Sequence, residues 1–166
     1  MSKSLNILAY AIKREEDGEK FYQENLERIH SAEAKEVLVA LKEMEKEHAD
    51  ILKRRYDAMS RGEEWTPIFE NKPGDNIFQI RSKTEKNSET DLNSALGDIS
   101  ILRMAYLIEE DLGNFYKNAA ANAEHSADKE LFEILAAWEV QHRDMLYKVY
   151  MEHFHDNWFD AGFSPF

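Results

Sequence analysis

Two Glu-x-x-His motifs are present in the sequence, Glu45 with His48 and Glu139 with His142. Residues three apart lie on one face of a helix, so each motif would present a carboxylate and an imidazole to the same neighbour. Oxygen and imidazole ligands without a thiolate suit iron or manganese, with zinc as an alternative. One such motif in a Glu-rich helix is usually a solvated face, so a single copy would indicate little.

The motifs belong to a longer repeat. A further glutamate lies 30 residues before each motif, Glu15 before Glu45 and Glu109 before Glu139. A shift of 94 positions superimposes the two sets without a gap. Several residues of the first copy are identical to the residue 94 positions later, among them Ile7, Leu8, Ala11, Phe21, Tyr22, Leu41 and Asp50. A duplicated helical hairpin is the simplest explanation, and duplication alone does not indicate a function.

Hydrophobic periodicity predicts four helices, and these must position the motifs. Their expected ranges are about 5–29, 32–61, 92–123 and 127–153. Ser31 and Ser126 are candidate caps for the second and fourth helices. The connections within each pair are short, so the paired helices should be antiparallel neighbours.

The segment from 62 to 91 contains Pro67, Pro73 and Gly74 and a long polar run, which predicts a connection with little helix. A helix of about 30 residues is about 45 Å long, and about 14 extended residues would span it. This segment could therefore cross over and make the third helix parallel to the second. We expect one domain over residues 1–166, an all-α antiparallel four-helix bundle with one long crossover and a short C-terminal tail.

The buried line of each expected helix is apolar at both ends and ionisable in the middle, judged by alternate spacings of three and four. Six ionisable residues lie on these lines: Glu15, Glu45, His48, Glu109, Glu139 and His142. A buried carboxylate without a partner costs several kcal/mol or takes up a proton. No Lys or Arg lies on the lines at that level, whereas two divalent cations would neutralise four carboxylates. The sequence therefore predicts two metal ions per chain, with iron favoured and manganese or zinc as alternatives.

Three further residues lie on the same lines. Tyr22 and Tyr116 each follow a proposed ligand glutamate by seven residues, which is two turns along one face. Core packing is the expected role of these tyrosines, and a hydrogen bond to a ligand carboxylate is the alternative. Gly18 either leaves room near the metals or makes a helix-packing contact.

Composition excludes several classes of protein. A formal net charge of −12 disfavours binding to nucleic acid and to anionic membranes. The absence of Cys rules out disulfides, zinc-thiolate sites and iron–sulfur clusters within these 166 residues. No apolar run is long enough for a signal peptide or a membrane span, so a cytoplasmic location is expected.

The sequence resembles the ferritin-like superfamily and, within it, the rubrerythrin-like proteins. The matching segments are AIKREEDGEKFY with EMEKEHADIL in the first half, and AYLIEEDLGNFY with AWEVQHRDML in the second. The resemblance implies that Glu45 and Glu139 bridge two metals. It further implies that Glu15 and His48 bind one metal and that Glu109 and His142 bind the other. The implied chemistry is the reaction of di-ferrous iron with peroxide or O₂.

Two departures from the family limit this interpretation. Rubrerythrins carry another Glu one turn after the ligand of the third helix, and that position is Leu112 here. They also usually carry a rubredoxin domain with four Cys, so electrons would have to come from an external electron-transfer protein.

The tail is too short for the fifth helix of cage-forming ferritins. Its aromatic residues and the habit of the family suggest a homodimer.

Three functions remain open from the sequence. The first is an oxidoreductase that reduces peroxide or O₂ at a di-iron centre. The second is a metal-binding protein without turnover. The third is a structural bundle that binds protein partners and has merely inherited the Glu and His residues.

Overall fold

The computed structural model describes residues 3–69 and 91–160, with side chains through residue 157. Four helices account for most of this part of the chain, and no strand occurs within it. They are α1 (Lys3–Asn25), α2 (Ala32–Arg61), α3 (Leu92–Ala121) and α4 (Ser126–Asp160). The prediction of an all-α bundle is confirmed.

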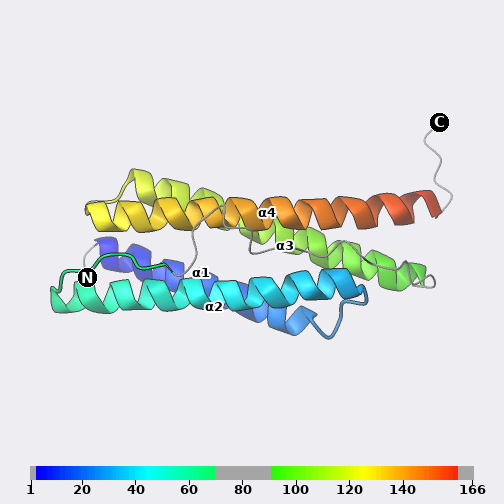
Figure 1. The fold of residues 1–166 in the computed structure, drawn as a ribbon, viewed down its shortest axis with the longest axis horizontal. Coiled ribbons are helices and arrows are strands. Elements are labelled where there is room, and N and C mark those ends of the chain that lie inside the picture. The colour runs from blue at the N-terminus through cyan, green and yellow to red at the C-terminus, as the bar shows by residue number, and fades with distance from the viewer. Residues whose placement is uncertain (1–2, 70–90, 161–166) are drawn as a thin grey trace.

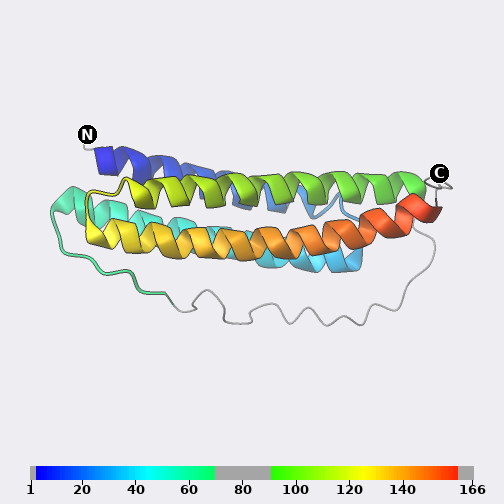
Figure 2. The same ribbon diagram turned by 90° about the horizontal axis from the view of Figure 1, so that it is seen from above.

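The helices form two antiparallel hairpins that pack side by side (Figures 1 and 2). α1 packs along α2 and α3 packs along α4, while smaller contacts join α1 to α3 and α2 to α4. The chain leaves α2 at one end of the bundle and α3 begins at the opposite end, so α2 and α3 run in the same direction. That is the arrangement expected of a long crossover, of which residues 70–90 lie outside the described part.

The ends of α2 follow local sequence signals. The Ser31 side chain accepts a hydrogen bond from the Ala34 backbone N–H at 3.3 Å, as predicted for an N-cap. Gly62 ends the helix with a φ of 68°, a left-handed conformation that glycine adopts without steric cost. The Glu63 N–H then bonds to the Ala58 carbonyl oxygen at 2.9 Å, which satisfies one of the terminal acceptors.

Two boundaries differ from the predictions. Ser126 is the first residue of α4 rather than the residue before it. α4 also continues past His153 to Asp160, so the expected tail is partly helical. The reason lies in the sequence, because the first helix-breaking residues after His153 are Gly162 and Pro165. Within the described residues, none of the helices has both the length and the apolarity needed to cross a membrane.

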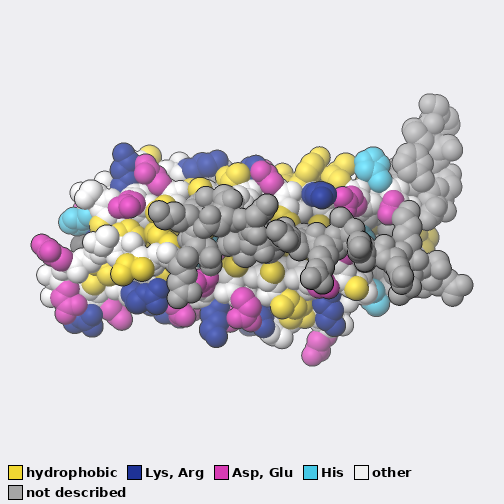
Figure 3. Space-filling model, viewed as in Figure 1, with side chains coloured by type: hydrophobic (Ala, Val, Ile, Leu, Met, Phe, Trp, Pro, Cys, Tyr) yellow, Lys and Arg dark blue, Asp and Glu magenta, His cyan; other side chains and the backbone are white. Residues whose placement is uncertain are grey.

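The core consists of two apolar clusters with a polar layer between them. The first cluster includes Leu8, Leu52, Leu112 and Leu135, and the second includes Leu38, Leu41, Leu102 and Leu146. The predicted core lines are buried near the middle of the bundle and become half-buried only toward their ends, as at Tyr56, Met59 and Ile99. On the surface, acidic, basic and hydrophobic side chains are intermixed over the face seen in Figure 3.

Buried carboxylates join the two hairpins near each end of the bundle. Asp98 of α3 accepts hydrogen bonds from the backbone N–H groups of His30 and Ser31, at 2.8 and 2.7 Å, just before α2 begins. Near the other end, Arg55 Nε of α2 donates to Asp128 Oδ1 in the first turn of α4 at 2.5 Å. These contacts fix the position of one hairpin against the other, and so the register of the polar layer between them.

Candidate metal centre

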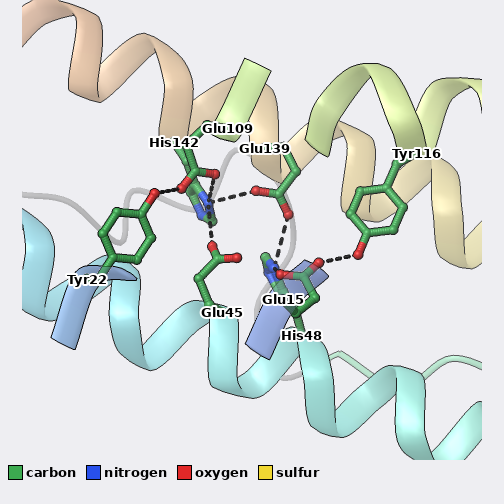
Figure 4. A network of polar contacts seen from close by, with 8 residues as sticks. All are labelled: Glu15, Tyr22, Glu45, His48, Glu109, Tyr116, Glu139 and His142. Atoms are coloured by element: carbon green, nitrogen blue, oxygen red, sulfur yellow. Dashed lines mark hydrogen bonds and ion pairs between the residues drawn. The ribbon is translucent and has the colours of Figure 1, made fainter. Parts of the chain in front are cut away.

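All six predicted ligand residues lie together in the polar layer, and each is at most 3% exposed. They form two overlapping groups. Within each group, the potential ligand atoms all lie within 4.8 Å of one another. One group is Glu15, Glu45, His48 and Glu139, and the other is Glu45, Glu109, Glu139 and His142. Glu45 and Glu139 belong to both groups, which is the arrangement that two bridged metal ions would require (Figure 4).

Glu139 lies between the two histidines. Its Oε1 is 3.1 Å from His48 Nδ1, and its Oε2 is 3.2 Å from His142 Nδ1. Burial would raise the pKa of Glu139, but attraction to the two imidazoles outweighs burial and lowers it. Burial likewise lowers the pKa of each histidine, yet the surrounding carboxylates raise it to about 10 for His48 and about 9 for His142. Without metal, the histidines therefore act as the counter-charges of Glu139.

The other shared glutamate is in a different environment. Among the described residues, neither oxygen of Glu45 has a hydrogen-bond partner, and Oε1 lies 3.6 Å from His142 Nδ1. Burial raises the pKa of Glu45 well above its ordinary value, and repulsion from Glu109 and Glu15 adds to the shift. Burial also raises the pKa of Glu109, to about 8, with a further contribution from Glu139. The metal-free site therefore holds more carboxylate than its histidines can neutralise.

Cations fit this deficit. In the described part of the chain, five atoms of the two ligand groups are buried without a hydrogen bond. They are Glu15 Oε2, Glu45 Oε1, Glu45 Oε2, Glu139 Oε1 and His48 Nδ1. Arg55 is the one buried Lys or Arg in the described part of the chain, and it is paired with Asp128. Buried polar atoms normally have partners, so these unpartnered atoms indicate a site for divalent cations.

The hydroxyl groups of Tyr22 and Tyr116 each donate a hydrogen bond to a glutamate of the opposite hairpin. Tyr22 of α1 donates to Glu109 Oε1 of α3, and Tyr116 of α3 donates to Glu15 Oε1 of α1 (Figure 4). Both tyrosines are fully buried, so they pack in the core and also make the predicted alternative contact, a hydrogen bond to a ligand carboxylate. These hydrogen bonds orient Glu15 and Glu109, the two outer glutamates, which each belong to only one ligand group.

Sequence reasoning missed Trp138. Its ring stacks on His48 at a centroid distance of 5.0 Å and an interplanar angle of 12°. His48 in turn stacks on His142 at 5.6 Å and 7°. Phe69 also packs against the indole, in an edge arrangement with a centroid distance of 5.0 Å and an interplanar angle of 82°. The signal was the apolar residue directly before Glu139, but only the packing of α4 against α2 shows which ring it meets.

Comparison with protein families matches the chain to the family described as Rubrerythrin over residues 6–92 and 100–160. These ranges contain all six residues of the polar layer. The chain belongs to the rubrerythrin family. The searches of curated proteins and of solved structures found no significant match.

The chain departs from the rubrerythrin pattern at Leu112. Leu112, at the position where rubrerythrins carry an additional glutamate, is fully buried within the first apolar cluster. In the described residues the rubrerythrin site therefore has four carboxylates and two histidines and no fifth carboxylate. The histidines outside the motifs do not join it: His30 contacts Asp98, and His153 Nε2 lies 3.2 Å from Ser31 Oγ at the end of the bundle.

Proposed function

We propose that this protein is a di-iron carboxylate protein of the rubrerythrin type, in which di-ferrous iron reacts with peroxide or O₂. The observation that carries the proposal is the pair of overlapping ligand groups, which share Glu45 and Glu139 and leave buried oxygens without partners. Membership of the rubrerythrin family supports it. Manganese and zinc can also bind carboxylate and imidazole ligands, so the identity of the metal is part of the proposal.

The chain's own residues would have distinct roles. Glu15 and His48 would hold one ion and Glu109 and His142 the other, with Glu45 and Glu139 shared. An iron pair held there would supply two electrons and act as a Lewis acid toward the oxidant. The tyrosine hydroxyls orient the outer glutamates, and the two apolar clusters keep water away on either side. Because the 166 residues contain no Cys for an iron–thiolate centre, an external electron carrier would return the electrons.

Anaerobic loading with two equivalents of Fe²⁺, followed by H₂O₂ in a stopped-flow spectrometer, tests this function. We expect iron oxidation to be much faster than for Fe²⁺ in buffer. Glu45→Gln should abolish the acceleration, and Glu47→Gln, at an exposed glutamate two residues away, should preserve it. Oxidation no faster than in buffer, with two irons bound, would contradict the proposal.

The second candidate is a metal-binding protein without turnover. Leu112 favours it, because the site lacks the additional glutamate found in rubrerythrins. This function predicts tight binding of two metals per chain, oxidation of the iron once at most, and no continued peroxide consumption with any electron donor. A steady-state peroxide assay with a chemical reductant separates the two candidates.

A further inference from the structure

The two shared glutamates differ in how much freedom their surroundings allow. Glu139 has a histidine nitrogen within 3.2 Å of each carboxylate oxygen. Glu45 is fully buried and, within the described part of the chain, has no hydrogen bond at either oxygen. Both oxygens of Glu139 therefore lie closer to a histidine nitrogen than Glu45 Oε1, which is 3.6 Å from His142 Nδ1, so Glu45 is the more weakly held of the two.

Gly18 of α1 lies directly against the Glu45 carboxylate. A Cβ atom at Gly18 would be 3.1 Å from Glu45 Oε2 and 3.5 Å from Glu45 Cγ, so the carboxylate would have to move by a few tenths of an ångström. Glycine inside a helix is less stable than alanine, so its presence in the middle of α1 needs a reason. The close approach of Glu45 supplies that reason.

The second hairpin differs at the matching place. The residue 94 positions after Gly18 is Leu112, which is fully buried. Gly113, the glycine that approaches Glu139, would place a Cβ atom 3.5 Å from Glu139 Cβ, which is ordinary van der Waals contact. A side chain at position 18 would thus meet the carboxylate of one shared glutamate, whereas a side chain at position 113 would meet only the Cβ atom of the other.

We propose that Gly18 keeps the space in which the Glu45 carboxylate changes its coordination while Glu139 stays fixed. A small oxidant, peroxide or dioxygen, then reaches the metal pair on the Gly18 side and not on the Gly113 side. This inference rests on the proposed function and deepens it. Gly18 is a positioning residue, because it acts through Glu45.

The experiment uses Co²⁺, whose visible absorption reports coordination, and azide as a stand-in for the oxidant. The full chain is loaded with cobalt, the metal content is measured, and azide is titrated into the wild type, Gly18→Ala and Gly113→Ala. We expect all three to bind two cobalt ions. Gly18→Ala should bind azide at least about tenfold more weakly, while Gly113→Ala should match the wild type.

Unchanged azide affinity in Gly18→Ala, loss of cobalt from that variant, or equal weakening in Gly113→Ala would each overturn the inference. A crystal structure of the wild-type cobalt–azide complex tests the same point without any variant. Azide beside Gly18 supports the inference, and azide beside Gly113 overturns it. Failure of the proposed function has a different signature, since azide can bind as expected to a site whose iron does not react with peroxide.

Discussion

Tyr116 donates its hydroxyl hydrogen bond to Glu15 on the opposite hairpin, although Glu109 precedes it by two turns on its own helix. Tyr22 makes the reciprocal bond to Glu109. The outer ligand of each proposed metal position is therefore oriented by the other hairpin.

Replacing either tyrosine by phenylalanine should weaken metal binding. The variant keeps the ring in the core but removes the hydroxyl that orients a ligand carboxylate, and such partners are typically worth about 10–100-fold in metal affinity. Competition with a chelator for Zn²⁺ or Co²⁺ measures the change. Tyr147→Phe, at a half-exposed tyrosine outside the site, is the control and should bind metal like the wild type.

The two shared glutamates should respond in opposite ways to substitution in the metal-free protein. Glu45→Gln removes a buried carboxyl that has no hydrogen bond and a raised pKa, so it should stabilise the apo-protein by about 1–3 kcal/mol at pH 7. Glu139→Gln removes the partner of two buried histidines and should destabilise it by about 3–5 kcal/mol. Urea unfolding in the presence of a chelator measures both changes, and a change of the same sign in both variants would contradict this assignment.

The apo-protein should lose stability as the pH rises. His48 and His142 have folded pKa values of about 10 and about 9 against an ordinary value of 6.5, and Glu109 has about 8 against 4.5. A group whose pKa is raised on folding keeps a proton that the unfolded chain has lost, so its stabilising contribution disappears as the pH rises through the folded pKa.

Unfolding free energies measured between pH 6.5 and 10 should therefore fall by up to about 1.4 kcal/mol per pH unit for each such proton. Metal-loaded protein is the comparison. Ligands must lose their protons to bind metal, so the stabilisation by metal should increase over the same range. A metal-free protein whose stability is flat or rising between these pH values would disagree with the electrostatics of the site.

The Arg55–Asp128 pair should matter more than the ion pairs on the surface. Arg55→Ala would leave Asp128 buried with neither oxygen paired, at a cost of about 3–5 kcal/mol in the free energy of unfolding. Arg61→Ala breaks an exposed pair with Glu63 and should have little effect. Changing both buried partners to apolar residues, Arg55→Met with Asp128→Leu, should recover much of the loss. Thermal melts of the four proteins decide the matter.

Helical periodicity and the 94-residue offset were enough to predict the bundle and to place the six polar residues at one level. Both signals are local or repeat along the chain, and sequence patterns record them well. The partners of Tyr22 and Tyr116 could not be predicted in this way, nor could the stacking of Trp138 on His48. Those contacts depend on how one hairpin is positioned against the other, which Asp98 and Arg55 help to fix.

The end of α4 was missed for a different reason. The sequence of its last residues mixes aromatic and polar side chains without helical periodicity. The absence of Gly or Pro between His153 and Gly162 was the better guide to where the helix ends.

Because each ligand group draws on both hairpins, the duplication has an evolutionary consequence. A single hairpin supplies Glu, Glu and His of one group, and only a second hairpin supplies the fourth residue. A separate ancestral hairpin could complete such a site only by pairing with an identical copy, and every substitution would then have appeared on both sides of it. Fusion into one chain removes that symmetry. It allows Gly18 to differ from Leu112, and Met44 from Trp138, so the two faces of one site can evolve separate tasks.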